Sequence, residues 1–273
     1  MIKTISENIN LDEYLNNLFC SKKITYLLKQ EKRIKINNKI VINNIQLNKN
    51  DIISIDLLKD EETNVIPTKS QLDILYEDDY LLIINKPIGI LIHDDNLQNT
   101  LDNYVAYYYK ITNQKHNIYH IHRLDKNTSG CILYCKQPYL TAVLNNMLET
   151  KKIQRTYLAL AEGEIKKQLI INKPIGNDRH QNNHYIISKT GKQAITIVQP
   201  LKRIDDNTLI KCILKTGRTH QIRVHLSSIN HPLIGDILYG GKKADRLMLH
   251  SYNIKFIHPV TEKIIDISCP IKF

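Results

Sequence analysis

Residues 122–135 read His-Arg-Leu-Asp-Lys-Asn-Thr-Ser-Gly-Cys-Ile-Leu-Tyr-Cys, a polar loop that runs directly into an apolar strand. Gly130, where the loop ends, permits a sharp turn because glycine has no Cβ. Polar loops between buried strands are frequent sites of function. Asp125 is therefore either a functional carboxylate or a surface residue that pairs with Arg123 or Lys126.

Strands and helices surround this loop from residue 71 to the end of the chain. The alternation of apolar residues predicts strands at 72–76, 80–85, 132–135, 155–161, 194–199, 208–216, 248–256 and 263–268. Helices are predicted over 100–110 and 138–151, and the second of these has a proline at an early position. Its inward face is formed by Leu140, Val143, Leu144 and Met147. These elements indicate an α+β catalytic domain, built on a mixed, mainly antiparallel sheet with flanking helices.

Residues 1–58 form a second, smaller α+β unit. Leu11, Leu15 and Leu18 share one helical face, and Ser21 can cap a second helix that follows. Apolar alternation from Arg33, an Asn-Asn turn and a strand near residue 51 complete the unit. Seven of its nine basic residues lie between positions 22 and 39, where Glu31 is the sole acid. The expected RNA contacts in this patch are Lys22, Lys23, Lys29, Lys32, Arg33 and Lys35.

Residues 59–70 are polar, contain Pro67 and have no periodicity, so they are predicted to be a linker. The expected organisation is a small RNA-binding module at 1–58, this linker, and a catalytic domain at 71–273.

The overall composition agrees with a folded domain that binds a polyanion. The 273-residue chain is 42% hydrophobic and has a net charge of +11, although a lysine- and asparagine-rich composition would give the same charge. No apolar run reaches the length of a membrane span, and the first residues lack the apolar core of a signal peptide. We therefore expect no membrane association and a cytoplasmic location.

Five scattered cysteines do not form a disulfide pattern. Cys131 and Cys135 fall on the same face of one strand because successive side chains alternate. A metal site would need further ligands at suitable spacing, and none is near them in the sequence. The cysteines are therefore interpreted as buried thiols, and no metal is expected.

A second informative stretch, residues 214–226, reads Leu-Lys-Thr-Gly-Arg-Thr-His-Gln-Ile-Arg-Val-His-Leu. A strand is predicted to end at Gly217 and a helix to begin near Thr219 as its N-cap, with Ile222 and Leu226 toward the core. At the helix start the basic side chains would favour an anion, either a phosphate or a carboxylate such as Asp125. The alternative is that the arginines lie on a surface helix. The basic residues concerned are Arg218, His220 and Arg223.

Together the two stretches resemble the signature loop and a late motif of RluA-type pseudouridine synthases. Supporting matches occur in the family's order at Tyr76-Glu-Asp, Asn85-Lys-Pro-Ile-Gly, Arg155-Thr-Tyr-Leu-Ala, Lys173-Pro-Ile-Gly, Gly191-Lys-Gln-Ala-Ile-Thr and His231-Pro-Leu-Ile-Gly-Asp-Ile-Leu-Tyr-Gly. Residues 1–58 resemble the small RNA-binding module first named from a ribosomal protein.

The chain departs from these patterns at a few positions. Asn10 replaces a usual arginine of the module, and His93 is followed by Asp94 instead of proline. Asn127 stands where an aspartate is common, and Arg155 stands where a lysine is usual. Neither of these last two residues is expected to touch the groups that react.

The resemblance implies an enzyme that isomerises uridine in RNA without a cofactor. Asp125 would be the catalytic carboxylate, with Arg223 as its charge partner and Arg218 as second choice. Tyr157 would stack on uracil and assist proton transfer, and Arg123 would fill the gap left by the flipped base. The remaining residues expected at the RNA or in the loop are His122, Thr128, Arg218, His220 and Gln221.

Two other functions remain open on the sequence alone. A ribosome-assembly factor could keep the fold without the chemistry, although Asp125, Tyr157 and the arginines are all present. A hydrolase would need a second acid, and Asp236, which resembles a turn residue, is the one available in the matched motifs. The expected substrate is 23S-type ribosomal RNA, with transfer RNA as the alternative, and the expected state is a monomer.

Overall fold

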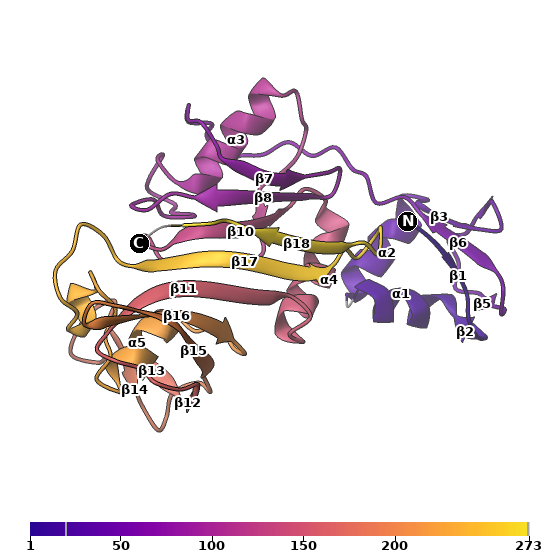
Figure 1. The fold of residues 1–273 in the computed structure, drawn as a ribbon. Coiled ribbons are helices and arrows are strands. Elements are labelled where there is room, and N and C mark those ends of the chain that lie inside the picture. Colours follow the sequence, from indigo (N-terminus) through magenta and orange to yellow (C-terminus); the bar gives the residue numbers. More distant parts are fainter. Residues whose placement is uncertain (20, 272) are drawn as a thin grey trace.

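A computed structural model describes residues 1–19, 21–271 and 273, so Cys20 lies outside the described residues. Its centre is a ten-stranded sheet (Figure 1). Eight strands follow one another in the order β12 (Leu169–Asn172), β15 (Ile195–Ile204), β16 (Asn207–Leu214), β11 (Gln154–Glu162), β17 (Leu249–Ile257), β10 (Ser129–Cys135), β8 (Leu81–Lys86) and β7 (Ile74–Glu77). Two more pair at the side, β18 (Ile264–Ser268) with β17 and β9 (Tyr119–His120) with β10.

Among the described residues, β10 with β17 is the one parallel pair in this sheet. The prediction of a mixed, mainly antiparallel α+β fold is therefore confirmed.

The sheet has a separate hydrophobic core on each face, because successive side chains of a strand point to opposite sides. Leu81 and Ile83 of β8 belong to one core, and Leu82 and Ile84 belong to the other. Helix α4 (Pro138–Glu149) packs into the first core, together with Cys131 and Cys135. Helices α3 (Leu101–Ile111) and α5 (Gln221–Ser227) pack into the second. The predicted inward face of α4 and the burial of the described cysteines are confirmed.

The N-terminal module contains the two predicted helices, α1 (Leu11–Phe19) and α2 (Lys22–Gln30). Ser21 caps α2 as predicted, because its hydroxyl accepts a hydrogen bond from the Ile24 N–H at 3.3 Å. A four-stranded sheet lies beside the helices, in the order β1 (Ile2–Thr4), β6 (Ile52–Ile55), β3 (Ile34–Ile36) and β4 (Lys39–Ile40). A small ribbon pairs β2 (Ile9–Asn10) with β5 (Gln46–Leu47).

Residues 59–70, predicted to be a linker, form neither helix nor strand. The segment is nevertheless hydrogen-bonded along its length to the catalytic domain. The Lys59 N–H donates to the Gln137 side chain at 2.9 Å, and the Thr68 N–H donates to the Asn103 carbonyl at 3.1 Å. It therefore lies along the domain surface.

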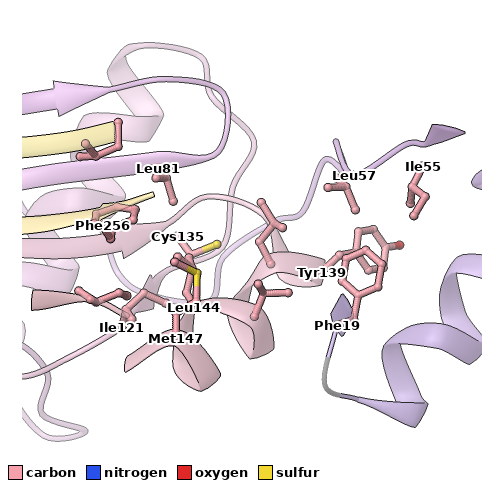
Figure 2. Packing of buried hydrophobic residues seen from close by; sticks show 14 of the residues in the cluster. Phe19, Ile55, Leu57, Leu81, Ile121, Cys135, Tyr139, Leu144, Met147 and Phe256 are labelled. Carbon is pink, nitrogen blue, oxygen red and sulfur yellow. The ribbon is translucent and has the colours of Figure 1, made fainter. Parts of the chain in front are cut away.

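One hydrophobic core crosses from the module into the catalytic domain. Figure 2 shows Phe19 of α1 and Leu57 beside Tyr139 of α4, with Leu144 and Met147 continuing the cluster toward the sheet. Module and helix α4 are therefore packed as parts of one core.

A charged cluster closes the edge of this shared core. Glu31, at the end of α2, accepts hydrogen bonds from Arg33, Lys59 and Tyr139. The Arg33 guanidinium and the Lys59 ammonium also lie 5.4 and 5.5 Å from the Tyr139 ring centre. Burial acts to raise the pKa of Glu31, but these hydrogen bonds lower it to about 2. The cluster therefore holds an ionised carboxylate between the two parts of the chain.

A hairpin of β13 (Ile175–Asn177) and β14 (Tyr185–Ile187) packs against α5 and was not predicted. It shares a small core with Val224 of α5 and with Tyr239, which belongs to a 3-10 turn at Ile237–Tyr239. None of the helices that the structure describes is long and apolar enough to cross a membrane.

Candidate active site

The loop of residues 122–128 is anchored at both ends on the sheet. Leu124 is buried in the second core, and the Asp125 side chain remains 24% exposed. A turn follows, in which the Thr128 N–H donates to the Asp125 carbonyl at 3.0 Å. Gly130 then has φ +107°, and a Cβ there would be 2.2 Å from the Ser251 carbonyl oxygen of β17. The absence of a side chain thus lets the loop end lie directly on β17.

A buried lysine holds the backbone of the loop through hydrogen bonds. Lys86, at the end of β8, is fully buried, and its ammonium donates to the carbonyl oxygens of Pro87, Ile90 and Lys126 at 2.8–3.0 Å. Burial lowers its pKa to about 8, although the negative charge of Asp125 opposes the shift. Because Lys126 follows Asp125, this ammonium links the backbone beside the carboxylate to β8.

Asp125 faces two basic side chains of the late motif. The Arg223 guanidinium reaches its Oδ2 from Nη1 at 3.4 Å, and His220 Nε2 lies 3.8 Å from the same oxygen. The other nitrogens of Arg223, Nε and Nη2, both bond the Asp236 carboxylate at 2.8 Å. Arg223 is therefore held in a bidentate pair with a buried acid while one nitrogen faces Asp125.

His220 is oriented by a chain of hydrogen bonds. The Tyr185 N–H donates to the Tyr239 oxygen at 3.1 Å, and that hydroxyl lies 2.8 Å from His220 Nδ1. These contacts fix the plane of the imidazole ring and leave Nε2 facing Asp125. Burial lowers the pKa of His220 although the charge of Asp125 opposes it, so the ring is neutral at pH 7.

The helix of the late motif begins later than predicted. The residue before α5 is His220, in the left-handed region at φ 55°, and no side chain caps the helix. The prediction of Thr219 as N-cap was therefore wrong. The Gln221 amide oxygen instead accepts from the Arg218 N–H and the Thr216 hydroxyl, so it closes a turn ahead of the helix. Ile222 and Leu226 are buried in the core as predicted.

The structure brings together only part of the predicted set around Asp125. Arg223 and His220 lie beside it, whereas the Arg218 side chain donates to the Gln193 carbonyl at 3.0 Å. Gln221 is buried and bonds the backbone of β15, so it holds the turn rather than facing solvent.

Other predicted residues differ in exposure. Arg123 is exposed, while Thr128 is buried. His122 is also buried, and its Nε2 accepts from the Leu133 N–H at 3.2 Å. Burial lowers the pKa of His122 to about 3, with a further contribution from the charge of Arg155. Tyr157 is buried on β11, and burial raises its pKa.

The basic patch of the module is partly neutralised within the chain. Lys29 bonds Asp12 at 2.7 Å, and Arg33 bonds Glu31 and Asp56 at 2.7 and 3.1 Å. The other predicted contacts are exposed, namely Lys22, Lys23, Lys32 and Lys35. The surface available to a polyanion is therefore smaller than the sequence suggested.

Two residues that bond the neighbours of Asp125 were not predicted as partners. Asp236 was interpreted as a turn residue, and Tyr239 was not considered, yet they bond Arg223 and His220. The signal was present in the motif that begins at His231, which contains both residues. Within the described residues, no group of His, Cys, Asp or Glu is arranged to hold a metal ion.

Comparison with known proteins shows the family to which the chain is similar. A family model described as RNA pseudouridylate synthase matches residues 80–228, and one described as RluD ribosomal pseudouridine synthase N-terminal domain matches residues 1–53. The uncharacterized RNA pseudouridine synthase YhcT of Bacillus subtilis (strain 168) is 42% identical over 260 residues, covering 93% of this chain and 86% of that protein. Ribosomal large subunit pseudouridine synthase D of Yersinia pestis is 31% identical over 275 residues, covering 92% and 83%.

A solved structure shares the fold. Human RNA Pseudouridylate Synthase Domain Containing 1 superposes with a TM-score of 0.63 at 24% identity, covering 76% of this chain and 86% of that one. The chain belongs to the RNA pseudouridylate synthase family, in its RluA type. Members of this family isomerise uridine to pseudouridine, so the chain is an RNA-modifying isomerase.

Proposed function

We propose that this enzyme isomerises specific uridines of large-subunit, 23S-type ribosomal RNA, with Asp125 as the catalytic carboxylate. The observation that supports Asp125 most directly is its position, partly exposed and facing Arg223, whose other nitrogens are bound to Asp236. A guanidinium fixed in this way places a positive charge beside the carboxylate that would react. Asp125 would act at the ribose, either as nucleophile at the anomeric carbon or as base at the 2′ position.

The neighbouring residues are assigned complementary roles. Tyr157 would lie against the uracil and assist removal of the carbon 5 proton. Arg123, exposed on the loop, would fill the stack after the uridine flips out, a motion that costs a few kcal/mol. His122, Thr128 and Gln221 hold the two loops in shape.

Ribosomal RNA is favoured over transfer RNA by two comparisons. The Yersinia pestis relative is named a ribosomal large subunit synthase, and the model that matches residues 1–53 is described as a domain of a ribosomal pseudouridine synthase. The exposed lysines of the module would bind RNA phosphates beside the target. We expect a monomer, acting in the cytoplasm.

The test uses the wild-type enzyme and an Asp125→Asn variant. Each is incubated with unmodified ribosomal RNA and, separately, with unmodified transfer RNA, and pseudouridine is mapped by chemical labelling. We expect new pseudouridine in ribosomal RNA with wild type and none with the variant. Pseudouridine in transfer RNA alone would contradict the substrate, and activity in the variant would contradict the role of Asp125. Release of free uracil would instead indicate a hydrolase.

A further inference from the structure

Arg155 lies on the same strand as Tyr157, and its guanidinium is directed at the turn before His220. It precedes Tyr157 by two residues on β11, and the pairing with β17 shifts register between Thr156 and Tyr157, so Arg155 pairs with Ile254 and Tyr157 pairs with Ser251. Tyr157, Ala159 and Ala161 belong to the second core. Arg155 lies beyond this irregularity, near the start of β11, and its pairing partner Ile254 belongs to the first core.

The guanidinium extends toward the turn before His220. A Cβ at Gly217 would be 3.1 Å from Arg155 Nη2 and 3.3 Å from Nη1. Its charge also reaches the loop and the tyrosine, because it adds to the lowering of the pKa of His122 and opposes the burial that raises the pKa of Tyr157. Three segments of the active site thus converge around one positive group.

This guanidinium has no acceptor within the part of the chain that the structure describes. Its Nε is buried without a hydrogen-bond partner, and neither Nη1 nor Nη2 has a hydrogen bond or an ion pair there. Arg223, in contrast, has all three nitrogens facing carboxylates. Burying a donor without an acceptor costs free energy, so such a group is suited to receive its acceptor from a ligand.

We propose that Arg155 binds an anionic oxygen of the flipped uridine nucleotide, a proposal that rests on the function proposed above. When the bond between C1′ and N1 breaks, its electron pair stays on uracil, whose carbonyl oxygens share the negative charge. That pair returns when C5 bonds C1′, and the C5 proton leaves and is finally replaced by one on N1. Arg155 would stabilise the charged uracil, or it would bind the phosphate next to the target ribose.

The experiment compares Arg155→Met and Arg155→Lys with wild type, on whichever RNA the wild type modifies. The matched control is Arg203→Met, since Arg203 is 61% exposed and lies 3.8 Å from Glu164 on another part of the sheet. The single-turnover rate at saturating RNA and the affinity at several salt concentrations are measured. Thermal denaturation verifies that each variant is folded.

The two sources of the anionic oxygen give different results. If uracil is bound, Arg155→Met lowers the saturated rate by roughly 100- to 1000-fold while affinity changes little. If phosphate is bound, affinity falls and the slope of log affinity against log salt becomes smaller by about 1. In either case the affected quantity, the saturated rate or the RNA affinity, falls less in Arg155→Lys than in Arg155→Met. A saturated rate and an affinity both within about twofold of the Arg203→Met values would overturn the proposal.

Gly217→Ala provides a second measurement that leaves Arg155 in place. The added methyl group would displace the guanidinium by a few tenths of an ångström. Whichever of the saturated rate and the RNA affinity falls in Arg155→Met should therefore fall in Gly217→Ala as well, but by less. In an Arg155→Met background, Gly217→Ala should have little further effect. An equal effect in both backgrounds would contradict the contact. Activity of the Asp125→Asn variant would contradict the role proposed for Asp125. The comparison of the Arg155 variants with wild type would remain valid, so the two proposals can fail separately.

Discussion

Asp236 determines which nitrogen of Arg223 is available to Asp125. It is buried and binds Nε and Nη2, which leaves Nη1 for the carboxylate of the loop. We expect Asp236→Ala to lower the free energy of unfolding by roughly 3–5 kcal/mol, because it leaves a buried guanidinium without its main partner. The rate of pseudouridine formation should fall as well, since Arg223 loses its orientation. Urea denaturation and a single-turnover assay measure the two effects.

The control for this change is Asp206→Ala. The Asp206 side chain is 90% exposed and lies 3.9 Å from Arg203, so its removal should change the free energy of unfolding by less than about 1 kcal/mol. Equal losses in the two variants would mean that the pair between Asp236 and Arg223 contributes no special stability.

His122 should make the protein less stable in mild acid. Its pKa is about 3 in the folded chain and about 6.5 in an unfolded one. The unfolded chain therefore binds one more proton between these values, and stability is lost as the pH falls below about 6.5. For this single site the slope is about 1.4 kcal/mol per pH unit.

The measurement is the free energy of unfolding of wild type and His122→Gln between pH 7 and pH 4.5. The glutamine oxygen can still accept from the Leu133 N–H, but it does not titrate. The free energy of unfolding of the variant should therefore depend less steeply on pH. Parallel curves for the two proteins would show that His122 does not cause the loss of stability in acid.

At the scale of residues, the sequence predicted that Asp125 faces Arg223 but did not predict the residues that support this pair. The resemblance placed Asp125 opposite Arg223, and the two side chains do face each other. Asp236 and Lys86 were missed as supports because their importance arises from contacts over long sequence distances. Pairings of this kind depend on the sheet order, which local patterns do not reveal.

At the scale of elements, the parallel contact between β10 and β17 depends on Gly130. A methyl group at this position would collide with the Ser251 backbone, and φ +107° is unfavourable for any other residue. We expect Gly130→Ala to separate the loop from β17, with a large loss of both thermal stability and activity.

Gly89→Ala is the matched control. Gly89 also has a positive φ, +81°, but a Cβ there would meet no atom within 4 Å. It should show the cost of the backbone conformation alone, roughly 1–2 kcal/mol. If Gly130→Ala is no more destabilising than Gly89→Ala, the close approach to Ser251 is not the constraint.

The long elements were predicted well and the short ones were not. Helices α1, α3 and α4 have an apolar face with the helical repeat, so their positions follow from sequence alone. Strands β13 and β14 have three residues each, too few for alternation to be recognised. The start of α5 was misplaced because Gln221, not Thr219, organises the preceding turn.

At the scale of the whole molecule, the exposed lysines of the module offer a test of RNA binding that leaves the shared core intact. Each exposed lysine that contacts a phosphate should contribute a salt slope of about 0.9, so changing it to glutamine should weaken binding and reduce the slope. The residues to change are Lys22, Lys23, Lys32 and Lys35. Binding is measured by titration of labelled RNA over a range of salt concentrations.

Lys29→Gln is the control within the same patch, because Lys29 is already bonded to Asp12. It should alter affinity less than the change of an exposed lysine. An effect as large as that of the exposed residues would mean that the pair with Asp12 opens when RNA binds.

The core shared by Phe19, Leu57 and Tyr139 has a consequence for how a target is chosen. A module on a flexible linker could bind RNA at many distances from the uridine. Here the module is rooted in the same packing as helix α4, so the span between its lysines and Asp125 is constant. The enzyme would then select uridines by distance, modifying only those that lie at the matching separation from backbone phosphates of the same folded RNA.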